Sequence, residues 1–323
     1  MKYLGIQTQQ RRNNIRSMMM LLLFPCVILF LTWVFFVIIH VFLGSDDAAA
    51  VSSWEDSWFI ANESFLNAAP WVVGVCFVWF LVAYFSNTAI IHAATGSHTL
   101  ERRDNKRVYN LVENLCMANG MPMPKINVIE DLSMNAFASG LNKQTYTVSL
   151  SRGIINRLSD DELEAVIAHE LMHIRNRDVH VLIVSIVFVG IFSFLTQIAS
   201  RSLLHGSVRS SKNDKNGGGL AILLVILVLA IIGYFITILM RFAISRNREY
   251  MADAGSAEMT KNPQALASAL RKISTDPLIE AVEQSDVAQL FIENPMKKGA
   301  SFINELFATH PPIEKRIRVL EQF

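Results

Sequence analysis

Four apolar runs constrain the fold of this chain more than any other feature. None of them contains Asp, Glu, Lys or Arg, and each is about as long as the roughly 20 residues that a transmembrane helix needs. The 323-residue chain is 52% hydrophobic and 18% charged, which is more apolar than a soluble domain usually is. We therefore expect a mainly α-helical integral membrane protein with about four transmembrane helices, at residues 18–43, 71–94, 179–199 and 220–240.

Charges beside the first two runs predict the orientation. Residues 1–17 carry four bases and no acid, whereas residues 44–70 carry five acids and no base. By the positive-inside rule the amino terminus is cytoplasmic and residues 44–70 form an external acidic loop. The alternative is a cleaved signal peptide, since Ala48, Ala49 and Ala50 are small, but the apolar run is longer than the usual signal core.

The linker between the third and fourth runs leaves the topology open. Residues 200–219 hold Arg201, Arg209, Lys212 and Lys215 against Asp214, yet two spanning helices would place this linker outside, contrary to the charge rule. Either both runs span, which we favour, or they form a hairpin within or on the membrane.

A metal motif lies between the second and third runs. His169 and His173 are four residues apart, so on a helix their side chains leave one face a turn apart and can occupy two corners of a zinc tetrahedron. Glu170 lies beside them and can take a proton from water whose pKa the zinc has lowered to near 7. Ser159 and Glu162 have capping-box spacing, which predicts that this helix begins there. The pattern predicts peptide hydrolysis.

A third ligand must come from elsewhere, since catalytic zinc usually takes three protein ligands. Glu249 is the best candidate, and Asp253, four residues later on the same helical face, could orient His169 or His173 through the nitrogen that does not bind metal. Taken alone, this pair is more often an ordinary charged helix face. The metal can be shared only if the chain crosses the membrane an even number of times between the motifs, which two spans satisfy.

The rest of the membrane-external chain predicts a small α/β unit. Helical spacing covers residues 108–119, and extended segments are expected at residues 126–130, 135–139 and 145–149, the last two joined by a turn at residues 140–143. In a metalloprotease such a strand can pair with an extended substrate, although it could equally be simple sheet structure. Helices are expected from Pro263, Pro277 and Pro311.

Three ordered motifs make the chain resemble a known family. The HtpX membrane zinc metalloproteases, related to the type I CAAX prenyl proteases, share the His-Glu-x-x-His motif, the later Glu-x-x-x-Asp and an upstream Asn-Ala-Phe-Ala strand, from about residue 108 to 318. The resemblance implies a gluzincin-type zinc protease domain with one Zn²⁺ per chain. It implies Glu249 as third ligand, Glu170 as general base, and a substrate-binding edge at Asn135, Ala136, Phe137 and Ala138.

The resemblance also implies a role for His310, which precedes Pro311. It could stabilise the oxyanion, or it could simply be the residue at which a helix begins. The expected substrates are misfolded or damaged membrane proteins, or other unfolded polypeptides, cut on the cytoplasmic side in quality control and the stress response. The expected location is the inner or plasma membrane, with a multi-pass topology.

Two other functions stay open. A CAAX-type prenyl-protein protease would need an enclosed chamber, and four apolar runs are few to build one. A catalytically inactive zinc-stabilised scaffold would have no use for Glu170. A net charge of +1 and the absence of a basic stripe give no reason to expect nucleic acid as a partner, and the sequence does not determine the oligomeric state. The catalytic domain is expected in two parts, residues 95–178 and 241–323.

Overall fold

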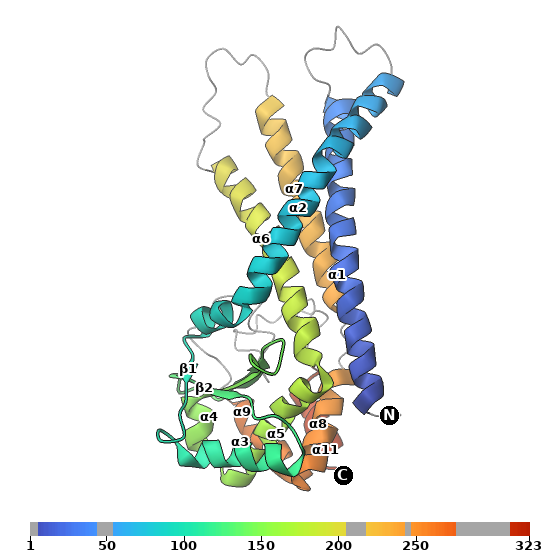
Figure 1. Ribbon diagram of the computed structural model, residues 1–323. Coiled ribbons are helices and arrows are strands. Elements are labelled where there is room, and N and C mark those ends of the chain that lie inside the picture. Colours follow the sequence, from blue (N-terminus) through green and yellow to red (C-terminus); the bar gives the residue numbers. More distant parts are fainter. Residues whose placement is uncertain (1–5, 44–53, 205–217, 243–246, 276–310) are drawn as a thin grey trace. The chain divides into compact units, whose positions relative to one another are not determined.

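The computed structural model describes residues 6–43, 54–204, 218–242, 247–275 and 311–323. The chain divides into two compact units. One comprises residues 18–85 and 187–241, and the other comprises residues 1–17, 86–186 and 242–323. We call them the apolar-helix unit and the α/β unit. Four long helices contribute to the apolar-helix unit (Figure 1): α1 (Ile6–Val37), which continues as the π-helix η1 (Ile38–Leu43), α2 (Trp54–Thr95), α6 (Asp178–Leu204) and α7 (Gly218–Phe242).

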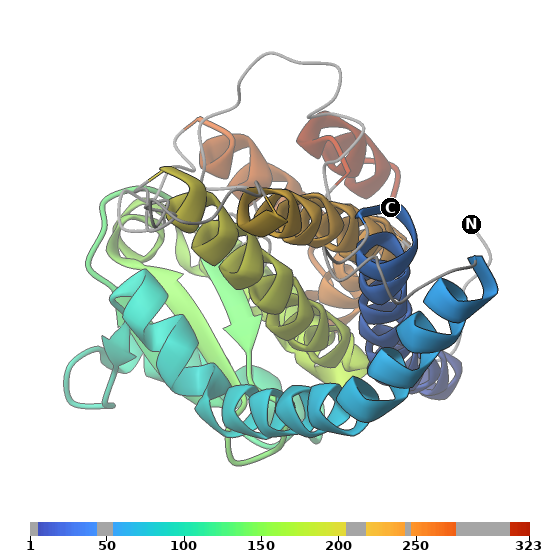
Figure 2. The same cartoon turned by 90° about the horizontal axis from the view of Figure 1, so that it is seen from above.

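Side-chain contacts connect these helices within their unit. The indole of Trp33 on α1 donates a hydrogen bond to Oδ1 of Asn62 on α2 at 2.9 Å. Phe192 on α6 packs edge-on against Phe24 of α1, with ring centroids 5.7 Å apart. Gly233 on α7 lies so close to the Phe192 ring that a β-carbon there would come within 2.1 Å of it, so α6 and α7 lie side by side, as the view in Figure 2 also shows.

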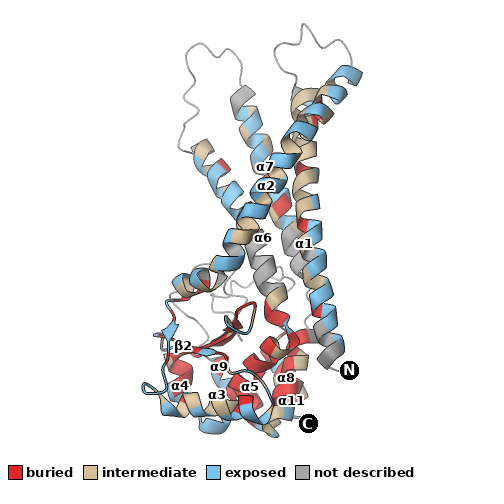
Figure 3. Cartoon of the chain, viewed as in Figure 1, coloured by how far each residue is buried: buried red, intermediate tan, exposed pale blue. Residues whose placement is uncertain are grey.

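The surface of these helices is apolar. Trp71 is 78% exposed and Phe85 is 77% exposed, and Figure 3 shows exposed and partly exposed residues along α1 and α2. Exposed apolar area on this scale is typical of helices that face lipid. Within the described residues, the stretches Arg11–Phe42 and Trp54–Ser86 are long and apolar enough to cross a membrane, and Leu220–Ile236 is a shorter apolar stretch.

The helix boundaries differ from those expected. Residues 54–70, which we expected in a loop, form the first turns of α2, and α1 begins at Ile6 among the polar residues that precede the first apolar run. Glu55 and Asp56 in the first turn of α2 interact favourably with the helix dipole, so an acidic segment can still be helical. Hydropathy marks where a helix becomes apolar, which is a different position from where the helix begins.

The α/β unit contains a four-stranded sheet with the order β1-β2-β4-β3. Its strands are β1 (His98–Thr99), β2 (Lys125–Ile129), β3 (Ala136–Ser139) and β4 (Thr147–Ser151). β2 and β4 are parallel, and the other pairs are antiparallel. The expected hairpin is confirmed, since Ala136 pairs with Leu150 and Ser139 with Thr147. β1 was not expected, because a two-residue strand in a charged segment leaves no periodic signal.

Helix α5 (Asp160–Asn176) lies at the centre of the α/β unit. It contacts α3 (Lys106–Ala118), β3 and β4, and also α8 (Asn247–Thr260) and α9 (Pro263–Ile273). Figure 3 shows α5 largely buried. A short helix α4 (Arg152–Arg157) follows β4, and α11 (Ile313–Leu320) packs on α8 and α9. The helix expected from Pro277 lies outside the described residues, and α11 begins two residues later than expected because Pro312 is its N-cap.

Candidate metal centre

The ends of α5 place its two histidines. Ser159 forms the expected capping box, because its hydroxyl accepts from the backbone N–H of Glu162 and its own N–H donates to Oε2 of Glu162 at 2.9 Å. The helix ends at Arg177, which has a left-handed conformation with φ 60°. His169 and His173 therefore lie within the last two turns, on one face of a buried helix.

A close approach of α8 to α5 brings Glu249 to the histidines. A β-carbon on Gly255 would lie 2.3 Å from Cε of Met172, so the two helices touch at a position where only a hydrogen atom fits. Beside this contact the hydroxyl of Ser256 donates to the carbonyl oxygen of Ala165 at 2.6 Å.

Three ligand atoms converge where α5 and α8 meet. One atom from each of His169, His173 and Glu249 lies within 4.8 Å of the other two. The Nε2 atoms of the two histidines are 3.1 Å apart, and they lie 3.7 and 3.8 Å from the carboxylate oxygens of Glu249. The structure thus brings together the three residues that the sequence predicted as ligands.

A buried pair of charged residues supports His169. Oδ1 of Asp253 lies 3.0 Å from Nδ1 of His169, and Arg316 on α11 donates to both oxygens of the same carboxylate. Burial acts to lower the pKa of His169, but the interactions with Asp253 and Glu249 outweigh it and raise the pKa to about 9. A second proton on this imidazole and a metal ion would compete for the same Nε2 atom.

A second carboxylate, that of Asp178, contacts His173. Oδ2 of Asp178, the first residue of α6, lies 3.0 Å from Nδ1 of His173. An ionised carboxylate can only accept, so each histidine carries its hydrogen on Nδ1 and presents Nε2 to the cluster.

Glu170 is 1% exposed, and neither of its carboxylate oxygens has a hydrogen-bond partner among the described residues. Burial raises the pKa of this carboxyl group. A buried carboxyl group without partners is unfavourable for folding by about 1–3 kcal/mol, so its presence beside two histidines indicates a functional rather than a structural residue.

The charges of the cluster fit a divalent cation. Four buried carboxylates, those of Glu170, Asp178, Glu249 and Asp253, gather around the histidines. Among the described residues, the buried arginines that contact them are Arg248, 3.5 Å from Glu249, and Arg316. A cation among these groups would favour the ionised form of the carboxylates, and two imidazoles with a carboxylate are a ligand set that zinc takes in catalytic sites.

The strand β3 borders α5 at one edge of the sheet. Ser151 donates its N–H to the carbonyl oxygen of Asn135, so alternate residues of β3 bond to β4. The N–H and C=O groups of Ala136 and Ala138 therefore point away from β4. The N–H of Ala136 donates to Oδ1 of Asn135. The N–H of Ala138 also points away from β4, and Asn135 does not accept from it.

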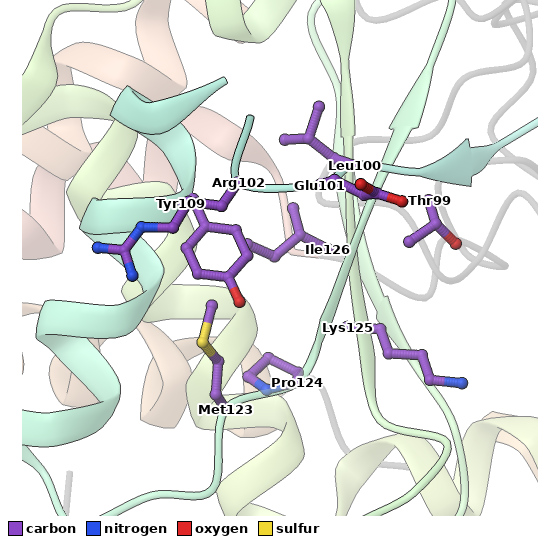
Figure 4. Close-up of a pocket in the computed structure, with 9 residues that line it drawn as sticks. All are labelled: Thr99, Leu100, Glu101, Arg102, Tyr109, Met123, Pro124, Lys125 and Ile126. Carbon is purple, nitrogen blue, oxygen red and sulfur yellow. The ribbon is translucent and has the colours of Figure 1, made fainter. Parts of the chain in front are cut away.

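A separate hollow of about 360 Å³ lies at the other edge of the sheet, near β1 and β2 (Figure 4). Figure 4 shows Tyr109 and Met123 beside it, and the guanidinium of Arg102 lies 5.3 Å from the centre of the Tyr109 ring. None of the cluster residues lines this hollow.

Sequence reasoning missed Arg316 and the role of Asp178. Arg316 lies on the same helical face as Ile313 and Leu320, so a base on the apolar stripe of an amphipathic helix was the available signal. Asp178 follows His173 by five residues across a helix break, which gives no regular spacing. His310 lies outside the described residues.

Comparisons with known proteins agree with this geometry. Residues 102–323 match peptidase family M48. A protease HtpX homolog from Bacteroides fragilis is 60% identical over the whole of both chains, and one from Ligilactobacillus salivarius is 37% identical over 77% of this chain and 83% of its own.

Among solved structures, the crystal structure of S. mikatae Ste24p matches with a TM-score of 0.47 and 20% identity, covering 80% of this chain and 60% of that one. The family match covers well over half of this chain, and the HtpX homolog from Bacteroides fragilis matches it from end to end. The chain therefore belongs to peptidase family M48 and is a metalloprotease of the HtpX type.

Proposed function

We propose that this metalloprotease uses a single Zn²⁺ held by His169, His173 and Glu249, and that Glu170 is its general base. The observation that carries the proposal is the convergence of these three ligand atoms beside a buried carboxylate that has no partner among the described residues. Zinc at this position would polarise a peptide carbonyl and make water a better nucleophile near neutral pH.

The residues of the chain then have distinct tasks. Glu170 takes a proton from the attacking water at a carboxylate oxygen and delivers it to the departing amide nitrogen. Asp253 and Asp178 hold the Nδ1 hydrogens of His169 and His173, which keeps both Nε2 lone pairs directed at the cluster.

The edge of β3 is the proposed substrate site, at Asn135, Ala136, Phe137 and Ala138. An extended peptide paired with the outward groups of Ala136 and Ala138 would be bound through its backbone, which demands little of its sequence. Such binding suits substrates that are unfolded and chemically diverse. His310 stays a proposed oxyanion stabiliser outside the described residues.

The proposed substrates are misfolded or damaged membrane proteins, cut on the cytoplasmic side in the inner membrane. The apolar surfaces of α1 and α2 support a membrane location, and the bases of residues 1–17 support a cytoplasmic amino terminus. In this proposal α6 and α7 also span, giving a multi-pass protein with four transmembrane helices.

Degradation of an unfolded model protein by the detergent-purified enzyme tests this function. Glu170→Gln should keep one bound zinc per chain and lose at least about 100-fold in kcat, since general base catalysis contributes that much or more. Glu164→Gln, the same change on an intermediate-exposure position of α5, is the matched control and should cut normally. Removal of zinc by a chelator should abolish cleavage, and re-addition should restore it. Zinc binding without cleavage by the wild type would indicate a scaffold instead.

A further inference from the structure

A buried hydrogen-bond chain connects the amino-terminal turns of α1 to His173. Asn13 is 3% exposed, and its Nδ2 donates to Oδ1 of Asp178 at 2.6 Å and to the carbonyl oxygen of Asn176 at 2.9 Å. The other oxygen of Asp178 lies 3.0 Å from Nδ1 of His173. These residues all belong to the α/β unit, although Asn13 and Asp178 are 165 positions apart in the sequence.

Both groups that accept from Asn13 lie in the short turn between α5 and α6. Asn176 is the last residue of α5, Arg177 has the left-handed conformation, and Asp178 begins α6. The last carbonyl groups of a helix have no partner within it, so Asn13 satisfies one of them from outside. The same amide group therefore holds both the backbone turn and the carboxylate that the turn presents to His173.

The donor and acceptor roles in these contacts are fixed, from the Asn13 amide to the Asp178 carboxylate and from the His173 ring to the same carboxylate. The amide NH₂ has two hydrogens, and both are used, one by Asp178 and one by Asn176. With one of its oxygens held in this way, the Asp178 carboxylate has its other oxygen directed at Nδ1 of His173. Loss of the Asn13 donor would free the Asp178 side chain to rotate and leave His173 without a fixed ring orientation.

The arrangement parallels the one at the other histidine. His169 is backed by Asp253, which Arg316 holds, whereas His173 is backed by Asp178, which Asn13 holds. Each carboxylate is thus fixed by a donor from a distant part of the chain. Removal of a carboxylate that contacts a metal-binding histidine typically changes metal affinity 10- to 100-fold, and the donors act by fixing these carboxylates.

We propose that Asn13 is a positioning residue of the metal centre, which acts on His173 through Asp178. The inference rests on the proposed function, because it requires His173 to be a zinc ligand. It makes the amino-terminal segment a structural part of the metalloprotease site rather than only a membrane anchor.

The test measures zinc affinity in the full-length, detergent-purified protein by competition with a chelator at fixed pH. Asn13→Leu removes both donors and keeps a side chain of similar size. It should weaken zinc binding by up to about 10-fold, the lower end of the effect of losing a direct partner of a ligand, because Asn13 acts through Asp178. Proteolysis should fall at limiting zinc and recover at excess zinc. Thr8→Leu, at an exposed position of the same helix away from this turn, should leave zinc affinity within about 2-fold of wild type.

Two further measurements separate positioning from folding. Thermal unfolding of the metal-free variants shows whether Asn13→Leu acts on the fold as a whole, and a lower Tm with unchanged zinc affinity would overturn the proposal. Asn13→Asp, which keeps the size but places a carboxylate against Asp178, should also weaken zinc binding, and wild-type affinity in this variant would overturn the proposal too. If the wild type bound no stoichiometric zinc, the proposed function itself would fail, which is a distinguishable result.

Discussion

Arg316 holds both oxygens of the Asp253 carboxylate, with Nη2 at 2.7 Å from Oδ1 and Nε at 2.9 Å from Oδ2. Both side chains are almost fully buried, and Asp253 in turn contacts Nδ1 of His169. Burial opposes the charge of Asp253, but Arg316 and His169 outweigh it and lower the pKa of this carboxyl group. The contact ties α11, near the carboxyl terminus, to the metal centre.

Substitution of Arg316 should therefore destabilise the protein strongly. Arg316→Met leaves the Asp253 carboxylate buried without its cation, and breaking a buried pair in this way typically costs about 3–5 kcal/mol. The measurement is thermal unfolding together with zinc content. Arg318→Met, an exposed position on the same helix, is the control and should change Tm little. Equal Tm values for the two variants would contradict this account of Arg316.

The contact between Gly255 and Met172 predicts that a side chain at position 255 of α8 displaces Met172 or the helix itself. Gly255→Ala would bring a β-carbon within 2.3 Å of Cε and 2.6 Å of Cγ of Met172, so the helices must separate or Met172 must move. Overpacking of this kind typically costs about 1–3 kcal/mol, and separation would also carry Glu249 away from the histidines.

A second substitution tests whether this contact is the cause. Met172→Ala in the Gly255→Ala background removes the atoms that clash, so Tm and zinc affinity should recover relative to Gly255→Ala alone. Additive losses in the double variant would mean that the two positions act independently, contrary to the prediction.

The pH dependence of stability should reflect Glu162. Burial opposes its charge, but hydrogen bonds from Lys272, Ser268 and the backbone of Ser159 prevail and lower its pKa from 4.5 to about 2. A carboxyl group whose pKa is lower in the folded than in the unfolded protein stabilises the folded state at pH values above 4.5. This contribution is lost progressively as the pH falls from 4.5 to about 2.

The measurement compares Tm of the wild type and Glu162→Gln between pH 7 and pH 3. The wild type should be more stable at pH 7, and the difference should shrink below pH 4.5. Glu164→Gln is the control, because burial and its acidic neighbours raise the pKa of Glu164, so this change should not destabilise the protein at pH 7. A difference for Glu162→Gln that does not depend on pH would contradict the prediction.

The outward N–H of Ala138 should matter for substrate binding alone. Ala138→Pro removes this donor without breaking a bond between β3 and β4, because the N–H points away from β4. It should lower kcat/KM for an extended peptide by about 2- to 10-fold, the loss of one backbone hydrogen bond. Zinc content should not change. Ala138→Ser keeps the N–H and should retain near-normal kcat/KM, so a similar loss in both variants would indicate that the side chain, not the backbone, is responsible.

Local sequence patterns predicted the elements that carry the site. Ser159 and Glu162 marked the start of α5, and the spacing of His169 and His173 placed both on one helical face. The β3–β4 hairpin followed from alternation around a turn at residues 140–143. In each case the residues that interact are close in sequence, so their spacing alone constrains them.

The lengths of the apolar helices were predicted less well. Within the described residues two stretches meet the length and composition of a membrane span, and residues 54–70 are helical rather than loop. Charge and hydropathy report the environment of a residue, whereas helix ends depend on caps and on backbone hydrogen bonds that those averages do not contain.

The sequence by itself predicted the chemistry of this protein, because the two imidazoles and Glu170 lie within two turns of one helix and the resemblance to the HtpX proteases added Glu249 and Asp253. Only the tertiary structure decided how that chemistry is held in place. Asn13 reaches Asp178, Arg316 reaches Asp253, and Gly255 meets Met172 across separations that carry no periodic signal. Such contacts depend on how whole helices pack, and packing is set by the summed fit of many side chains rather than by any local pattern.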